Sequence, residues 1–239
     1  MLDFACMAKI DSLSVFLPVY NEERDIAKTI LSVRDTLSEV ATQWELIIVD
    51  DGSKDKTRDI IEGLTKNDPR IKIINHNSNR GYGASLRSGF YSAKYSWIAF
   101  MDSDGQFDFS EITNFIEKQN ETGADLVIGY YKERKVSFFK KITSKIWEFL
   151  VFILFGLKVK DIDCGFKLIS KKVIEKIPQL ESERGAFISS ELLIKAKKVG
   201  FRIVEIPVAH YPATRVGTGR KLNVIIQSFV DLIKLWKKL

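Results

Sequence analysis

Four short apolar runs, separated by longer stretches of helical character, constrain the fold of this chain more than any other feature. The runs are typical of buried strands and lie at 13–20, 44–51, 70–76 and 97–102. The helical stretches lie at about 24–40, 55–66 and 82–95, and a further helix at 110–121 precedes a strand at 125–130. Strands that alternate with helices at this spacing form crossover units and lie parallel. The sequence therefore predicts an α/β fold with a mostly parallel sheet flanked by helices.

The composition fits one domain with its own core. Of the 239 residues, 45% are hydrophobic and the mean hydropathy is -0.06, which indicates a folded chain rather than a disordered one. Because no internal repeat or low-complexity linker interrupts the sequence, we expect a single domain over residues 1–239 with its core at about 13–215. Two cysteines, Cys6 and Cys164, are too few for a disulfide framework or a structural zinc site, which favours a reducing compartment.

The formal net charge of +6 suits an anionic partner. Phosphate-bearing small molecules, an anionic membrane surface and nucleic acid all meet that description. The basic residues are spread along the chain, and most aromatic residues fall in apolar runs. Nucleic acid is therefore the least favoured of the three partners.

Polar clusters follow three of the predicted strands. They comprise residues 21–23, 50–55 and 102–106. In open α/β sheets, ligands bind beyond the carboxyl ends of the strands. Three such clusters at one edge of the sheet therefore predict a binding site there.

The stretch WIAFMDSDGQFD, residues 97–108, ends an apolar strand with two acidic residues one position apart. Asp102 and Asp104 repel each other unless water solvates them or a cation binds them. Hard divalent cations prefer oxygen ligands, and Mg²⁺ is commonly shared between one or two carboxylates and substrate phosphates. Gln106 offers a further, neutral oxygen. We expect Mg²⁺ or Mn²⁺ on Asp102, Asp104 and Gln106, where it would neutralise a departing diphosphate.

Two further turns suit other parts of a nucleotide ligand. In VDDGSKD, residues 49–55, Asp50 or Asp51 is placed to accept hydrogen bonds from ribose hydroxyls or base N–H groups. In NSNRGYGASLRSG, residues 77–89, glycines at a strand-to-helix turn suit close approach by a phosphate. This second turn lacks the Gly-Lys-Ser/Thr ending of a Walker loop and is not a dinucleotide fingerprint. P-loop NTPases and dehydrogenases are therefore excluded.

Six motifs occur in an order that resembles family 2 glycosyltransferases. They are FLPVYNEE, VDDGSKD, NRGYGASLRSG, MDSDGQF, DIDCGFKLIS and VEIPVAHYPATRVGTGRK. The resemblance covers residues 13–221, nearly the whole chain. Within the family, the chain is most similar to the dolichyl- and polyprenyl-phosphate sugar synthases. The resemblance implies a GT-A fold, a nucleotide-sugar donor and inversion at the anomeric carbon.

The resemblance also implies roles for individual residues. The nucleotide-sugar set comprises Pro18, Tyr20, Glu22, Asp50, Arg80, Gly81, Asp102 and Ser103. The catalytic set comprises Asp104, Asp161 and Arg215. The acceptor-phosphate set comprises Arg134, Glu191, Arg215, Arg220 and Lys221. Related sequences often carry arginine where this chain has Ala213, so which of Arg215, Arg220 and Lys221 contacts a phosphate stays open.

Two segments are unusually rich in large apolar residues. The first, at about 137–157, contains IWEFLVFILFGL between lysines, and the second, at 222–239, places large apolar residues on one helical face. Each segment either lies in a membrane interface or packs on the protein's own core. Neither reaches the roughly 20 apolar residues of a spanning helix. We expect peripheral attachment at the cytoplasmic face of a membrane, and the resemblance leaves room for a separate transmembrane subunit.

Together these features favour an inverting, metal-dependent glycosyltransferase that moves a hexose from a UDP- or GDP-linked sugar to a polyprenyl or dolichyl phosphate. A lipid phosphate is already anionic, whereas a sugar hydroxyl needs a general base, for which Asp161 is the candidate. One alternative is transfer to a glycan or cell-surface polysaccharide. An alternative of another class is a non-catalytic module that binds nucleotide sugars or membranes. A nucleotidyltransferase is disfavoured because PVYNEE is unlike the basic, glycine-rich loop expected after its first strand.

Overall fold

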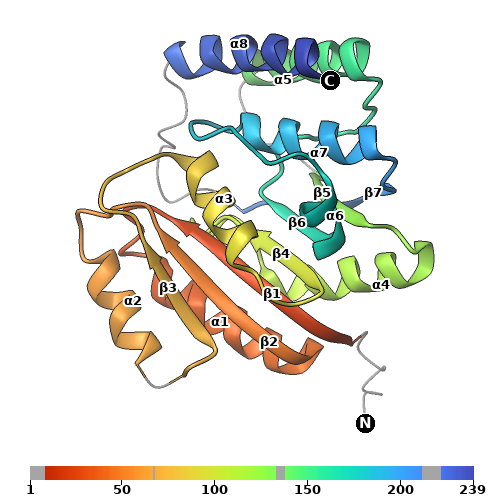
Figure 1. Cartoon of the computed structure of the whole chain (residues 1–239). Coiled ribbons are helices and arrows are strands. Elements are labelled where there is room, and N and C mark those ends of the chain that lie inside the picture. Colours follow the sequence, from red (N-terminus) through yellow and green to blue (C-terminus); the bar gives the residue numbers. More distant parts are fainter. Residues whose placement is uncertain (1–8, 67, 133–137, 212–221) are drawn as a thin grey trace.

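A seven-stranded sheet forms the centre of the computed structural model, which describes residues 9–66, 68–132, 138–211 and 222–239. The strand order is β3-β2-β1-β4-β6-β5-β7. The strands are β1 (Ile10–Val19), β2 (Ala41–Asp50), β3 (Ile71–Asn75), β4 (Trp97–Met101), β5 (Leu126–Tyr131), β6 (Phe166–Ser170) and β7 (Ile203–Val208). β6 runs antiparallel to its neighbours β4 and β5, and the remaining strand pairs are parallel (Figure 1). The predicted mostly parallel α/β sheet is confirmed.

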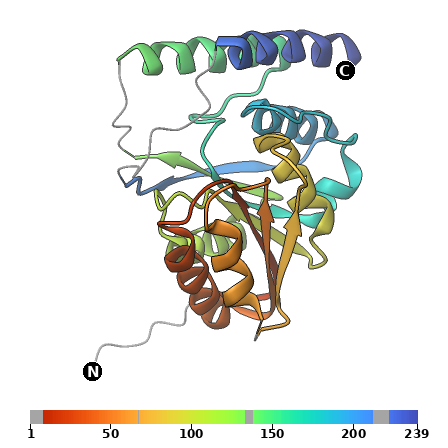
Figure 2. The same cartoon turned by 90° about the vertical axis from the view of Figure 1, so that its left-hand side faces the viewer.

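Helices cover both faces of the sheet. They are α1 (Ile26–Val40), α2 (Thr57–Thr65), α3 (Tyr82–Ser92), α4 (Ile112–Thr122), α5 (Phe138–Phe155), α6 (Lys171–Lys176), α7 (Phe187–Val199) and α8 (Leu222–Lys238), with a 3-10 turn at Phe109–Glu111. α1, α2 and α4 pack on one face of the sheet, and α3, α6 and α7 pack on the other. α5 and α8 lie side by side in a further layer beyond α7 (Figures 1 and 2).

Strand β1 divides the core into two parts. Successive side chains of a strand point to opposite faces, so Leu13 and Val15 pack on the α1 side while Phe16 points to the other. The ring of Phe16 lies edge-on to Phe90 of α3, with centroids 4.9 Å apart, and stacks on Phe100 of β4 at 5.4 Å. Because both faces are buried, the strand reads as a continuous apolar run rather than an alternating one.

The elements predicted up to residue 130 are confirmed, with their ends shifted by a few residues. β6 and β7 have no counterpart among the predicted strands. β6 carries Lys167 at a fully buried position, and β7 contains Pro207. Charge and proline both break the apolar pattern by which strands are identified in a sequence.

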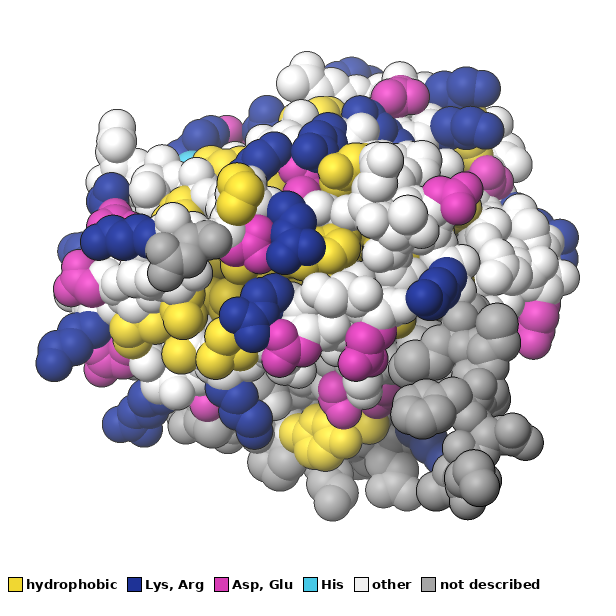
Figure 3. Space-filling model, turned by 90° about the horizontal axis from the view of Figure 1, so that it is seen from below, with side chains coloured by type: hydrophobic (Ala, Val, Ile, Leu, Met, Phe, Trp, Pro, Cys, Tyr) yellow, Lys and Arg dark blue, Asp and Glu magenta, His cyan; other side chains and the backbone are white. Residues whose placement is uncertain are grey.

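The layer formed by α5 and α8 has a buried inner face and an exposed outer face. Trp147 of α5 donates from Nε1 to the hydroxyl of Ser190 on α7 at 3.0 Å, and its ring lies edge-on to Phe229 of α8 at 5.3 Å. The outer apolar face carries the exposed residues Ile146, Phe149, Phe152, Ile153, Ile226, Phe229, Val230, Ile233 and Trp236. The opposite end of the molecule, in contrast, carries lysines, arginines and carboxylates interspersed around apolar groups (Figure 3). In the described part of the chain, no helix combines the length and apolar character needed to cross a bilayer.

Candidate active site

The carboxyl ends of β1, β2 and β4 bring the polar clusters of the sequence to one edge of the sheet. β4 ends at Met101, which pairs with Phe166, the first residue of β6. Because β6 is antiparallel to β4, the segment that precedes it, residues 161–165, also lies at this edge. The sequence patterns did not predict β6, and they therefore missed the meeting of this segment with the acidic turn at 102–106.

Asp102 is held in place by two other parts of the chain. Its backbone N–H donates to the carbonyl of Gly165 at 3.1 Å, and its Oδ1 accepts from the hydroxyl of Tyr82 at 2.8 Å. Gly165 leaves room for the carboxylate, since a Cβ atom at that position would stand 2.1 Å from Oδ2 of Asp102. The buried hydroxyl of Ser103 donates to the carbonyl of Pro18 at 2.7 Å and ties the acidic turn to β1.

Asp104 turns back on its own loop. Its Oδ1 accepts from the backbone N–H of Gln106 at 3.1 Å, and Gly105 between them adopts a φ of 76°, which glycine tolerates without strain. Burial raises the pKa of the Asp104 carboxyl. Burial and the nearby charge of Asp104 raise the pKa of Asp102 to about 7. A cation would favour the charged form of both groups.

The acidic turn offers carboxylate and amide oxygens, the kind of ligand that a divalent cation takes. Mg²⁺ and Mn²⁺ take carboxylate oxygens, and Mg²⁺ usually completes its shell with water and substrate phosphates. Within the described ranges, no cluster of three or more His, Cys, Asp and Glu side chains forms a complete cation site. The assignment of a metal to Asp102, Asp104 and Gln106 stays a prediction.

Gln106 joins the acidic turn to the residues that follow β7. Its Nε2 lies 3.0 Å from Nε2 of His210, and it donates to the carbonyl of Tyr211 at 3.2 Å. The His210 ring packs edge-on against Phe107 and Tyr131, with centroids 5.9 and 4.3 Å away. Sequence reasoning assigned no role to His210. Its place just after the last strand, where the site edge also lies, is the signal that points to it.

The predicted nucleotide residues lie at the adjoining strand ends. Tyr20 and Glu22 follow β1 and are half-buried, and the backbone N–H of Glu22 donates to Oγ1 of Thr57 at 2.7 Å. Asp50, the last residue of β2, is 1% exposed, and its Oδ1 accepts from the backbone N–H of Ser53 at 3.0 Å. The structure thus brings this predicted set together at one edge, while its contacts with a nucleotide remain predictions.

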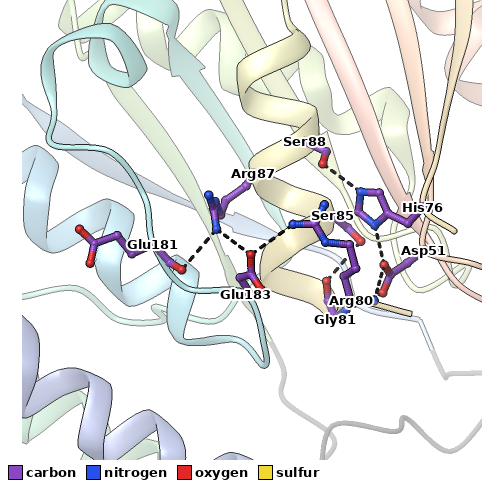
Figure 4. Close-up of polar contacts among 9 residues, drawn as sticks. All are labelled: Asp51, His76, Arg80, Gly81, Ser85, Arg87, Ser88, Glu181 and Glu183. Carbon is purple, nitrogen blue, oxygen red and sulfur yellow. Dashed lines mark hydrogen bonds and ion pairs between the residues drawn. The ribbon is translucent and has the colours of Figure 1, made fainter. Parts of the chain in front are cut away.

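Asp51 organises the glycine turn before α3 (Figure 4). Its Oδ1 lies 2.6 Å from Nδ1 of His76 and accepts from the backbone N–H of Arg80 at 2.9 Å. Its Oδ2 accepts from the backbone N–H of Gly81 at 2.8 Å. His76 in turn places Nε2 2.9 Å from the hydroxyl of Ser88 on α3. Of the two adjacent aspartates, Asp51 therefore stabilises the glycine turn before α3 through hydrogen bonds within the protein.

We expect Asp51→Asn to lower the free energy of unfolding by about 1–3 kcal/mol, because an amide NH₂ would face a backbone N–H that loses its acceptor. Urea unfolding of the two proteins measures this difference. Asp35→Asn removes a carboxylate that is 65% exposed on α1, and it should change stability by less than about 0.5 kcal/mol. Equal losses in the two variants would contradict the role of Asp51.

A loop at residues 181–184 packs against this turn. One carboxylate oxygen of Glu183 lies 3.2 Å from guanidinium nitrogens of both Arg80 and Arg87 (Figure 4). Glu191, on α7, is 2% exposed and accepts from the backbone N–H groups of residues 181 and 182 at 2.8 and 2.9 Å. It also pairs with Lys195 at 2.6 Å. These contacts support an indirect role for Glu191 through the loop, and its assignment to the acceptor stays a prediction.

Asp161 lies at the site edge and is 5% exposed. Its Oδ1 accepts from the backbone N–H of Asp163 at 3.0 Å, which shapes the segment that leads into β6. Its role toward the sugar or the acceptor stays a prediction. The remaining assigned residues lie outside the described ranges, and their roles stay predictions as well: Arg134, Arg215, Arg220 and Lys221.

A family model decides the affiliation of the chain. Residues 14–178 match the model described as glycosyl transferase family 2, which is more than half of the 239 residues. The chain belongs to glycosyl transferase family 2. The resemblance drawn from the motifs is thereby confirmed.

Several curated proteins and solved structures are similar to this chain. A dolichyl-phosphate beta-glucosyltransferase of Saccharomyces cerevisiae is 31% identical, over 95% of this chain and 72% of its own length. One of Trichomonas vaginalis is 29% identical, over 93% of this chain and 72% of its own length. The crystal structure of glucosyl-3-phosphoglycerate synthase from Mycobacterium tuberculosis with Mn²⁺, uridine diphosphate and phosphoglyceric acid superposes with a TM-score of 0.71. It is 19% identical and covers 95% of this chain and 78% of its own, and it confirms the GT-A-like fold.

Proposed function

We propose that the protein transfers a hexose from a nucleoside-diphosphate sugar to a polyprenyl or dolichyl phosphate at the cytoplasmic face of a membrane. The observation that carries the proposal is the acidic pair Asp102 and Asp104 at the carboxyl edge of the sheet, beside the ends of β1 and β2. The names of the relatives, which specify dolichyl phosphate, support the lipid acceptor. The exposed outer apolar face of α5 and α8 supports a location at a membrane.

In the proposed reaction, an oxygen of the lipid phosphate forms a bond to the anomeric carbon from the face opposite the diphosphate. The bond to the diphosphate breaks, and its electron pair leaves with the nucleoside diphosphate, so the configuration inverts. Asp50 and Tyr20 would bind the nucleoside, and Asp102 and Asp104 would hold Mg²⁺ or Mn²⁺. When bound, this cation would neutralise charge on the leaving diphosphate. Asp161 would orient the sugar, and the main catalytic terms would be positioning and electrostatic stabilisation.

Exposed lysine side chains accompany the outer apolar face, and their positive charge suits an anionic bilayer. Lys145, Lys234 and Lys237 are exposed on α5 and α8. An exposed apolar helix face with basic flanks suits insertion into the interface of a membrane. Each lysine close to an anionic surface contributes about 1 kcal/mol to attachment.

We expect the double variant Phe149→Glu, Ile233→Glu to bind anionic vesicles at least about tenfold more weakly, since a fully buried large apolar side chain contributes about 1.5–3 kcal/mol. Transfer to a dolichyl phosphate held in vesicles should fall in parallel. Transfer to a short, water-soluble prenyl phosphate should persist. Leu31→Glu, at a 37% exposed position on α1, is the matched control and should leave vesicle binding unchanged. Wild-type vesicle binding by the double variant would remove α5 and α8 from the attachment surface.

A radiochemical assay tests the function itself. Purified protein is incubated with Mg²⁺ or Mn²⁺, a detergent-dispersed dolichyl or polyprenyl phosphate, and labelled UDP-glucose, GDP-mannose or UDP-N-acetylglucosamine in turn. We expect an organic-soluble labelled product with one donor. A product that stays in the aqueous phase and forms only with a glycan acceptor would favour the polysaccharide alternative. Binding of donor without any transfer would favour the non-catalytic module.

A further inference from the structure

Lys167 carries a charge into the centre of the sheet. Its side chain is 0% exposed, and it lies on β6 opposite Phe100 of β4 and Ile128 of β5. Removing an ammonium group from water carries a large desolvation cost, so lysine is rarely buried completely unless partners compensate it. The position of Lys167 therefore requires specific partners.

The direct partner of its ammonium is a main-chain carbonyl. Nζ of Lys167 donates a hydrogen bond to the carbonyl oxygen of Cys164 and lies 5.3 Å from the centroid of the Phe100 ring. Cys164 precedes Gly165, whose carbonyl accepts from the backbone N–H of Asp102 and whose missing side chain leaves space for the Asp102 carboxylate. The ammonium thus fixes the stretch of main chain on which the position of Asp102 depends.

Acidic groups of the site act on the ammonium at longer range. Burial lowers the pKa of Lys167, and the Cys164 thiol together with Asp161, Asp163 and Asp102 opposes that shift. These acidic groups come from the segment before β6 and from the acidic turn after β4. Lys167 lies between Phe100 of β4 and Ile128 of β5 and is 0% exposed, so a mobile counter-ion from solvent has no access to its ammonium.

We propose that Lys167 is a positioning residue for the transfer reaction: by holding the Cys164 carbonyl, it fixes residues 161–165 and so places Asp161 and Asp102 relative to each other. The inference rests on the proposed function for its kinetic consequence. A displacement of 1 Å in a catalytic constellation can cost about a hundredfold in rate. Loss of the ammonium should slow the chemical step more than it weakens donor binding, because the residues predicted to bind the base and ribose, such as Tyr20 and Asp50, lie at the ends of β1 and β2 rather than in residues 161–165.

Two substitutions distinguish the contribution of the Lys167 charge from that of its hydrogen bond to the Cys164 carbonyl. Lys167→Met removes both the charge and the hydrogen-bond donor, whereas Lys167→Gln removes the charge and keeps a donor. In Lys167→Met we expect faster amide hydrogen exchange across residues 161–165, measured without metal or donor. We also expect kcat to fall at least about tenfold while the donor KM changes by less than about threefold. Lys167→Gln should lie between this variant and the wild type, and it carries the test if Lys167→Met fails to fold.

Lys195 offers a matched control for the loss of a buried lysine. It is 1% exposed, and its ammonium donates to the main-chain carbonyl of Gln179 at 2.6 Å, but it lies on α7. Lys195→Met should leave exchange in residues 161–165 unchanged. Unchanged exchange in the Lys167 variants, or an equal rise in Lys195→Met, would overturn the inference. If the wild type transfers no sugar to any lipid phosphate, the proposed function fails, and the exchange measurement still decides the role of Lys167.

Discussion

Asp104→Asn is expected to reduce sugar transfer by about a thousandfold while the protein stays folded. Asparagine keeps the shape of the side chain and an oxygen for the backbone N–H of Gln106, so only the charge is lost. Removing one group that stabilises developing charge in a transition state costs about 10²–10³ in kcat. Steady-state kinetics over a Mn²⁺ series measure the loss, and calorimetric titration of Mn²⁺ with a nucleoside diphosphate shows whether the cation still binds.

Asp108→Asn is the matched control, because it removes a carboxylate from the same acidic stretch. Asp108 is exposed, and its carboxylate accepts from the backbone N–H of Ser110 at 2.9 Å, an acceptor role that asparagine can retain. Its activity and Mn²⁺ binding should match those of the wild type. Turnover by Asp104→Asn within tenfold of the wild type would show that Asp104 is not required to bind the metal. It would also contradict the proposed stabilisation of the leaving diphosphate.

Gly165→Ala adds a single methyl group and should still lower kcat by about a hundredfold. The new Cβ would stand 2.1 Å from Oδ2 of Asp102, so the carboxylate must rotate or retreat. Either movement breaks the geometry that the hydroxyl of Tyr82 defines at Oδ1. Overpacking of this kind costs about 1–3 kcal/mol of stability, which a folded protein tolerates. Comparison of kcat with the thermal midpoint separates the catalytic effect from the loss of stability.

Gly63→Ala provides a contrast at a glycine without such a neighbour. Gly63 lies within α2, and a Cβ there would meet no atom within 4 Å. Alanine is favoured over glycine in a helix by about 1 kcal/mol, so this variant should be slightly more stable and fully active. Wild-type kcat in Gly165→Ala would show that transfer does not require the Asp102 carboxylate in the place described above.

The sheet edge with its acidic turn was predictable from the sequence for a definite reason. β1, β2 and β4 close with apolar residues that are buried on both faces of the sheet, so their ends are visible as changes in polarity. The residues after those ends must meet at one edge of a parallel sheet. The sequence alone therefore places Asp102 and Asp104 at the same edge of the sheet as Asp50.

Other parts of the site depend on tertiary contacts that a linear pattern does not contain. Asp50 and Asp51 are adjacent and chemically identical, and the contacts of Asp51 with His76, Arg80 and Gly81 distinguish its environment from that of Asp50. Glu191 was assigned to the acceptor side by resemblance, yet its carboxylate is occupied by loop N–H groups and Lys195. β6 could not be identified from the sequence, because a lysine within a strand normally indicates an exposed position. Without β6, the location of residues 161–165 at the site could not be predicted either.

The short connection between α5 and Asp161 limits where the chemistry can occur. Residues 156–160 join the end of α5 to Asp161, and a stretch of that length reaches about 20 Å at most. If α5 lies at the level of the lipid headgroups, transfer of the sugar would take place at the depth in the membrane where the lipid phosphate is already located. The isoprenoid tail would stay dissolved among the acyl chains throughout the catalytic cycle. The enzyme should accordingly accept carriers of different tail length with similar efficiency, provided that they share the same bilayer.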